Sequence, residues 1–209
     1  IRMKALAGAR SAETLGAQRE GTGVVIDEHG HILTIGYVVN EADSIEITTH
    51  ESKTVAATLV GYDHATGLSL LRAMARLEGV TPMQFGSADA LAVHEPVMVL
   101  PHGGRAAASI GYVMSKRKFT ASWEYLLESA LFISPPTMQW AGAALVNREG
   151  KLVGVGSLLL RAVEASQPVP GNMFVPVDAL KPIPKDLIAN GRRTEPARPW
   201  LGLGTEELQ

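Results

Sequence analysis

The chain has 209 residues, of which 46% are hydrophobic and 19% are charged, and its formal net charge is −2. This composition is typical of a globular protein and argues against disorder, and the charge balance gives no support to a nucleic acid or an anionic membrane as partner. There is no cysteine, which excludes disulfides, thiolate catalysis and thiolate zinc sites. No apolar run is long enough to cross a bilayer, so we expect no transmembrane segment in this chain. Because the chain begins at Ile1 and not at methionine, we expect a fragment, and residues 1–20 show no signal sequence.

The first half of the chain predicts short strands joined by turns. Residues 21–27 and 31–35 are apolar runs on either side of a Glu-His-Gly turn, which is typical of a β-hairpin. Residues 44–50 alternate between apolar and polar side chains, as a half-buried strand does. Two further strands are predicted over residues 53–61 and 68–72.

The second half continues this pattern after an irregular stretch, residues 76–92, which we expect to cross between two lobes. Further strands are predicted over residues 95–100, 109–115, 131–133, 144–147, 151–155 and 174–177. Helical spacing follows up to residue 190, on the C-terminal side of Pro182 and Pro184. Short strands at this spacing predict an all-β barrel or sandwich and not an α/β fold.

Read together, these segments resemble the HtrA/DegP family of trypsin-like serine proteases over residues 21–203. The motifs that carry the resemblance are Gly21-Thr-Gly-Val-Val-Ile-Asp, Val38-Val-Asn-Glu-Ala-Asp, Val60-Gly-Tyr-Asp-His-Ala-Thr-Gly-Leu-Ser-Leu-Leu, Phe85-Gly-Ser-Ala-Asp, Leu145-Val-Asn and Arg198-Pro-Trp-Leu-Gly. The resemblance implies an all-β fold of two perpendicular six-stranded β-barrels, with the active site in the cleft between them.

The resemblance also implies a domain organisation. Residues 1–190 correspond to the protease-type domain, with one lobe over about residues 1–92 and the other over about residues 93–190. Residues 191–199 are a linker rich in Arg and Pro. Residues 200–209 look like the start of a PDZ domain.

The family's catalytic triad can be carried over position by position. Its Ser lies in Asn-Pro-Gly-Asn-Ser-Gly-Gly-Pro, its His directly before Val-Val-x-x-Ala-Asp, and its Asp between Thr and Leu-Ala-Leu-Leu. The corresponding residues here are Ala141, Tyr37 and Gly67. A methyl group cannot attack a carbonyl, a tyrosine with its ordinary pKa of about 10 is a poor general base, and glycine has no carboxylate to orient an imidazole. Since losing the triad typically costs about a million-fold in turnover, we predict a degenerate protease without catalytic residues.

The loop before the nucleophile position is altered as well. The family's Gly-Asn-Ser turn, whose backbone N–H groups form the oxyanion hole, reads Gln139-Trp-Ala here, so the glycine's conformational freedom is lost. Trp140 suits two roles, a plug of the vacated pocket or an exposed anchor for a partner. We assign Gln139, Trp140 and Gly142 as candidate substrate-binding residues.

Other polar residues offer weaker candidates. His64 fits a turn, and His102 lies on a loop near the expected cleft, where it could contact a ligand. Ser134 and Thr137 precede the nucleophile position by several residues, which strict triad geometry does not tolerate. The six histidines lack tight metal-ligand spacing, so we expect no metal and no cofactor, although a site built from distant histidines stays open. The charged residues Arg19, Glu20, Arg192 and Arg193 are interpreted as solvated.

These observations lead to three functional hypotheses. The leading one is a non-catalytic binding or regulatory pseudoprotease that adds unfolded or extended peptide as a strand to a barrel edge, or pairs with an active HtrA-type relative. The second is a serine endopeptidase with unrecognised catalytic residues, and the third is a scaffold repurposed for ligand or metal binding. The resemblance implies a periplasmic or cell-envelope setting. An oligomer is possible, although residues 1–20 lack the aromatic residues that hold the family's trimers.

Overall fold

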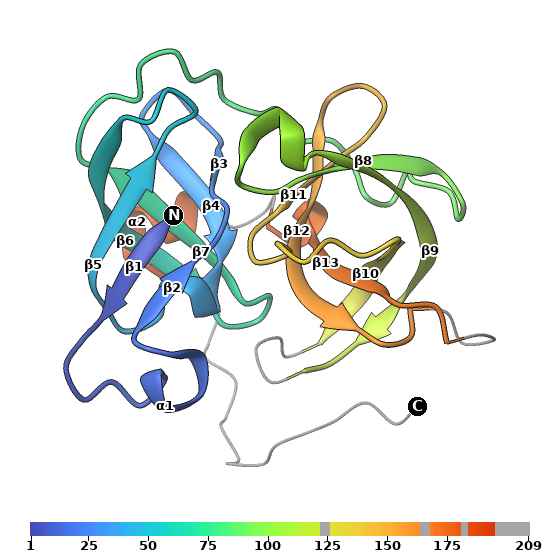
Figure 1. The fold of residues 1–209 in the computed structure, drawn as a ribbon, viewed down its shortest axis with the longest axis horizontal. Coiled ribbons are helices and arrows are strands. Elements are labelled where there is room, and N and C mark those ends of the chain that lie inside the picture. The colour runs from blue at the N-terminus through green and yellow to red at the C-terminus, as the bar shows by residue number, and fades with distance from the viewer. Residues whose placement is uncertain (122–125, 164–167, 181–183, 195–209) are drawn as a thin grey trace.

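The computed structural model describes residues 1–121, 126–163, 168–180 and 184–194, and in these residues the chain forms two all-β lobes (Figure 1). Strands β1 to β7 make the first lobe and strands β8 to β13 make the second. The segment between β7 and β8 crosses from one lobe to the other, as predicted for residues 76–92. The predicted all-β, trypsin-like fold is confirmed. Residues 195–209, where a PDZ domain is expected to begin, lie outside the described residues.

The first lobe is a curled antiparallel sheet of seven strands in the order β2-β1-β5-β6-β7-β4-β3. Its strands are β1 (Arg2–Ala5), β2 (Gln18–Glu20), β3 (Val24–Val25), β4 (His31–Ile35), β5 (Ala42–Thr48), β6 (Thr54–Asp63) and β7 (Leu68–Ala73). The expectation of a six-stranded closed barrel is wrong here, because no ladder joins the edge strands β2 and β3. The backbone N–H groups of the segment that connects β2 and β3 bond to other parts of the chain. Gly21 donates to the Ile1 carbonyl, and Thr22 donates to the Ala141 carbonyl in the other lobe.

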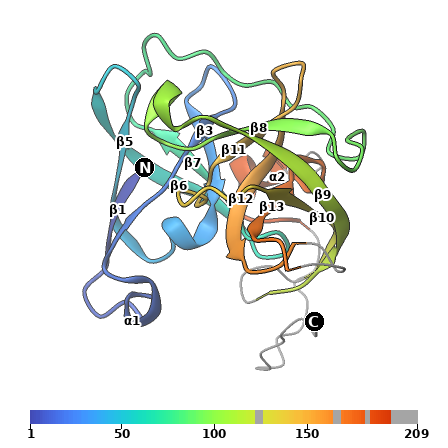
Figure 2. The ribbon, with the colours of Figure 1, turned by 45° about the vertical axis from the view of Figure 1, so that its right-hand side comes forward.

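The second lobe is the closed six-stranded barrel that the resemblance implies, in the order β10-β13-β12-β11-β8-β9. Its strands are β8 (Pro96–Leu100), β9 (Ser109–Phe119), β10 (Leu127–Ser134), β11 (Ala144–Val146), β12 (Leu152–Leu160) and β13 (Gly171–Pro176). The long strand β9 curves around the barrel (Figure 2). Inward-facing residues such as Val99, Leu145 and Phe174 fill its interior, since successive side chains of a strand point to opposite faces.

Short helices complete the fold. Within the described residues, two are α-helical, α1 (Ala12–Leu15) and α2 (Pro184–Asn190), and three are 3₁₀ turns, η1 (Gly36–Val38), η2 (Gly104–Ala107) and η3 (Val177–Ala179). Helix α2 begins at Pro184, as the proline positions predict, because proline is tolerated in the first helical turn. It packs on β6 of the first lobe and buries Leu187.

The turn between β3 and β4 is organised by one carboxylate. Oδ1 of Asp27 accepts hydrogen bonds from the backbone N–H groups of His29 (2.9 Å) and His31 (3.0 Å). Oδ2 of Asp27 lies 2.6 Å from Nδ1 of His31, whose ring is buried. Partial burial opposes the charge of Asp27, but the hydrogen bonds from His31 and His29 outweigh it, so the pKa of Asp27 is lowered.

We predict that Asp27→Asn makes stability less sensitive to acid. A lowered folded-state pKa means that the Asp27 carboxylate stabilises the protein above its unfolded pKa of about 4, and that this contribution is lost as the pH falls through the folded value. The substitution should lower the free energy of unfolding by about 1–2 kcal/mol at pH 7 and flatten its decline below about pH 4. Urea unfolding at pH 7 and pH 3 measures both effects. The exposed Asp43, replaced by Asn, is the control, and an equal effect there would contradict the prediction.

Candidate functional site

Loops from both lobes meet where the family resemblance places the active site. The N–H of Gly36, which opens η1, donates to the carbonyl of Gly67 over 2.7 Å. The N–H of Thr22 donates across the lobes to the carbonyl of Ala141 over 2.8 Å. A Cβ on Gly21 would contact both Val38 and the Ala141 carbonyl. The structure therefore gathers Tyr37, Gly67 and Ala141 at one junction.

Tyr37 fastens the two lobes together at this junction. Its ring is half-buried, and its Oη donates a hydrogen bond of 2.7 Å to the backbone carbonyl of Ser157 on β12. The two residues are separated by 120 positions in the chain. A phenol hydrogen is thus placed on an acceptor in the other lobe, so Tyr37 acts here as a donor.

The loop around Ala141 is locked by backbone contacts. Gly142 is buried with a φ of 74°, and its N–H donates to the Gly156 carbonyl over 2.9 Å. A Cβ at Gly142 would overlap the Thr22 carbonyl and the Thr34 hydroxyl, so only glycine fits. The N–H of Gly156 in turn donates to the Ala143 carbonyl over 2.8 Å. Gly142 therefore serves the junction through its backbone.

The two residues before Ala141 are accessible. Gln139 is exposed, and its N–H donates to Oγ1 of Thr137 over 3.3 Å. The family resemblance assigns this N–H to the oxyanion-hole position, and it is paired within its own loop. Trp140 is half-buried.

Asn172 on β13 holds this loop in place, although nothing in the sequence pattern pointed to it. Its Oδ1 accepts the N–H of Thr137 over 2.7 Å, and its Nδ2 donates to the Thr137 carbonyl over 3.2 Å. The hydroxyl of Ser134 donates to the carbonyl of Pro170 over 2.8 Å. Thr137 and Ser134 thus have structural partners within the second lobe.

The histidines singled out from the sequence lie apart. The backbone N–H of His102 donates to Oγ1 of Thr22 over 2.7 Å, so its loop does reach the junction, while its side chain is exposed. The exposed ring of His64 lies against Tyr62, with 4.6 Å between the ring centroids. Among the residues that the structure describes, no group of three or more histidine or acidic side chains is placed to hold a metal ion.

Arg19 is a residue whose role sequence reasoning missed, since it was interpreted as solvated and is only 6% exposed. Its Nη1 donates to the carbonyls of Tyr37 (2.8 Å) and Asn40 (3.1 Å). Its Nη2 donates to Oγ of Ser11 (2.7 Å), and its Nε donates to the Gly16 carbonyl (3.0 Å). The guanidinium therefore holds the backbone of the η1 turn by hydrogen bonds. The only sequence signal for its burial is the alternation along the strand, in which Arg19 lies between the exposed Gln18 and Glu20.

A surface hollow of about 510 Å³ lies elsewhere, between the β3–β4 turn and residues 72–82. Arg72 and Arg76 are among its lining residues, and both are exposed. None of Tyr37, Gly67 and Ala141 lines it, so this hollow is separate from the junction between the lobes.

The fold and the junction define a class of protein. The family model of the trypsin-like peptidase domain matches residues 21–155, and the chain belongs to this family. The relatives and solved structures to which it is similar are of the HtrA/DegP type. It is 28% identical over 196 residues to a "Probable periplasmic serine endoprotease DegP-like" of Ectopseudomonas mendocina, covering 92% of this chain and 39% of that protein. It is also 28% identical over 202 residues to the "Serine protease Do-like HtrA" of Lactobacillus helveticus, covering 91% of this chain and 47% of that protein.

Solved structures agree on the fold. The HtrA-type protease AlgW with a tripeptide has a TM-score of 0.70 at 21% identity, covering 83% of this chain and 57% of that one. The same protease with a decapeptide has a TM-score of 0.69 at 20% identity, covering 82% and 52%. This chain spans less than half of the length of the curated relatives named above. In the described residues, no helix has the length and apolar character needed to span a membrane.

We predict that Tyr37→Phe weakens the attachment of the two lobes. The substitution removes the hydrogen bond to the Ser157 carbonyl and should lower the free energy of unfolding by about 1–2 kcal/mol, measured by urea denaturation. Tyr112→Phe is the matched control, because the Tyr112 side chain is 47% exposed. Equal stabilities of the two variants would contradict the role given to Tyr37.

We also predict that Arg19→Gln is strongly destabilising. It leaves the carbonyls of Tyr37, Asn40 and Gly16 without their buried donor, at a cost of about 2–4 kcal/mol in unfolding free energy. Arg2→Gln should cost less than about 1 kcal/mol, because Arg2 forms an exposed ion pair with Glu20. Thermal unfolding of both variants measures these losses. An Arg19→Gln variant as stable as the unaltered chain would refute the role given to Arg19.

Proposed function

We propose that this chain is an HtrA-type protease domain that has lost its catalytic triad and binds extended peptide at the junction between its lobes. Its curated relatives are named serine endopeptidases, which gives the activity of the family. In this chain, the residues assigned to the nucleophile, base and orienting positions are Ala141, Tyr37 and Gly67. None of the three supplies the group that acyl transfer to a serine requires.

One observation carries the proposal. The hydroxyl of Tyr37, at the position assigned to the general base, is committed to the Ser157 carbonyl of the opposite lobe. A side chain that holds the lobes together cannot also take a proton from a nucleophile at Ala141, where there is no hydroxyl to lose one. The pairing of the Gln139 amide with Thr137 supports the same conclusion, because an oxyanion hole needs free N–H donors aimed at the substrate.

Peptide binding is favoured over an inert scaffold by the loop before Ala141. Met138 is 72% exposed, Gln139 is exposed and Trp140 is half-buried, so apolar and amide groups are presented beside the junction. Partly exposed aromatic residues are common anchors of protein interfaces. Unfolded or extended peptide is the partner that we propose, in a periplasmic or cell-envelope setting like that named for the relatives.

Two other functions make different predictions. An endopeptidase with unrecognised catalytic residues would react with a serine-hydrolase probe. A regulatory subunit would bind an active HtrA-type relative in preference to an isolated peptide.

The first test is labelling by a fluorophosphonate probe together with cleavage of casein. We expect the unaltered chain to show no labelling above a heat-denatured sample and no cleavage, because Ala141 offers no nucleophile. The variant Tyr37→His/Gly67→Asp/Ala141→Ser is measured beside it, after circular dichroism confirms its fold. Labelling of the unaltered chain would refute the loss of the triad.

The second test is the binding of fluorescein-labelled casein, followed by anisotropy. Trp140→Ala should weaken binding about tenfold if the indole is an anchor. Met74→Ala is the control, since Met74 is 71% exposed and lines the surface hollow that is separate from the junction. No binding by the unaltered chain, or equal binding by both variants, would reject the peptide-binding site.

A further inference from the structure

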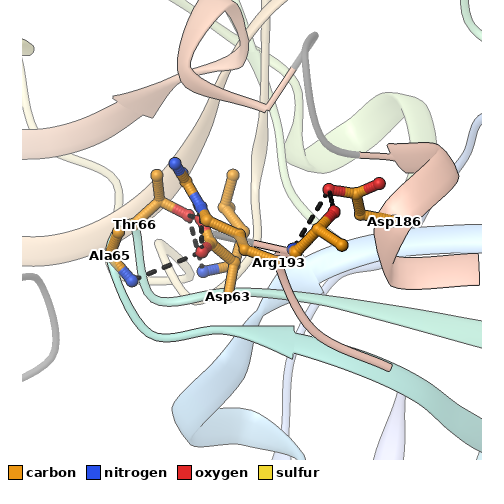
Figure 3. Close-up of polar contacts among 7 residues, drawn as sticks. Asp63, Ala65, Thr66, Asp186 and Arg193 are labelled. Carbon is orange, nitrogen blue, oxygen red and sulfur yellow. Dashed lines mark hydrogen bonds and ion pairs between the residues drawn. The ribbon is translucent and has the colours of Figure 1, made fainter. Parts of the chain in front are cut away.

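The segment that follows α2 is held to the first lobe by an ion pair whose acidic partner is buried. Asp63 ends β6 and is 1% exposed, whereas the Arg193 side chain is 23% exposed. Nε of Arg193 donates to Oδ1 of Asp63 over 2.5 Å, and its Nη2 donates to Oδ2 over 2.8 Å (Figure 3). A bidentate pair fixes orientation as well as distance. The interpretation of Arg193 as a solvated linker charge is therefore wrong.

Backbone contacts support the same attachment. The N–H of Tyr62 donates to the Gly191 carbonyl over 3.2 Å. A Cβ on Gly61 would lie 2.8 Å from this carbonyl, so the approach of the two segments depends on glycine. The N–H of Thr194 donates to Asp186 over 3.1 Å, which connects the segment to α2.

The buried carboxylate also shapes the turn that leads to the junction. Oγ1 of Thr66 donates to Oδ2 of Asp63 over 2.5 Å, and the N–H of Gly67 donates to the Asp63 carbonyl over 2.8 Å. The Gly67 carbonyl then accepts the N–H of Gly36 over 2.7 Å. Because Gly36 opens the turn that carries Tyr37, these hydrogen bonds and the short backbone segments between them connect Arg193 to the interlobe contact.

We propose that Arg193 is a positioning residue for the junction, so that the attachment of the segment after α2 and the placement of Gly67 and Tyr37 are coupled. Within the described part of the chain, no other lysine or arginine pairs with Asp63. Withdrawal of Arg193 leaves a buried carboxylate without its countercharge, which destabilises the Asp63–Gly67 turn.

As a means of regulating peptide binding, the coupling rests on the proposed function. The physical connection between Arg193 and the junction does not depend on the proposed function. Amide hydrogen exchange can test this connection without any peptide. The exchange rates of four amides are measured. The amide of Tyr62 reports on the attachment of the segment after α2, and those of Gly67 and Gly36 report on the connection to the junction. The amide of Gly142 reports on the second lobe.

The experiment compares Arg193→Gln with Arg192→Gln, its exposed neighbour. In Arg193→Gln, we expect the amides of Tyr62, Gly67 and Gly36 to exchange about tenfold to a hundredfold faster, with Gly142 unchanged. Arg192→Gln should leave all four rates unchanged. If Arg193→Gln does not fold, Arg193→Lys, which keeps the charge but loses the planar fork, is judged by the same criteria.

Two results would overturn the coupling. Faster exchange at Tyr62 alone would mean that the ion pair only attaches the segment locally. Equal acceleration of all four amides would indicate global unfolding. Casein anisotropy on the same variants separates the two proposals, since absence of binding by the unaltered chain rejects the proposed function, while the exchange rates decide the coupling.

Discussion

The pairing of backbone polar groups where the two lobes meet is the constraint on which the rest of the structure depends. Thr22, Gly36, Gly67 and Gly142 are buried at this junction, so their N–H and C=O groups need partners within the protein. The Thr22 amide is satisfied by the Ala141 carbonyl, and the Gly142 amide by the Gly156 carbonyl. The first sheet is open between β2 and β3, and Thr22 in the segment that connects them is bonded to the other lobe.

Two buried charges hold the loops of the first lobe against this junction. Arg19 lies under the turn of Tyr37 and donates to its carbonyl, while Asp63 lies at the start of the turn of Gly67 and accepts from Arg193. Each charge is paired or hydrogen-bonded, as burial requires. Arg19 and Asp63 thus hold the backbone at the positions assigned to the base and the orienting acid. The side chains at those positions are the phenol of Tyr37 and the hydrogen atom of Gly67. A scaffold of this kind suits binding at a fixed geometry, which does not need a nucleophile.

Most strands from residue 21 onward were predictable because their residues follow simple periodic patterns, whereas β1 and β2 were not predicted. The run that became β4 was predicted with its observed bounds, and the alternating run near β5 was placed within two residues of its start and end. The site residues could be located only through motif resemblance, since Tyr37, Gly67 and Ala141 have no local feature that marks them as neighbours. The roles of Arg19, Asn172 and Arg193 were missed, because each acts through partners that are distant in the sequence.

The sequence by itself indicated the all-β class, most of the strands along the chain, the resemblance to a protease family and the residues assigned to the triad positions. Alternation, turn residues and motif order are local properties, so they can be read along a single chain. Only the tertiary structure decided that the first sheet stays open, that Tyr37 bonds to Ser157, and that Arg193 reaches Asp63. These contacts join residues up to 130 positions apart, and whether a charge is solvated or buried depends on which distant segments fold around it.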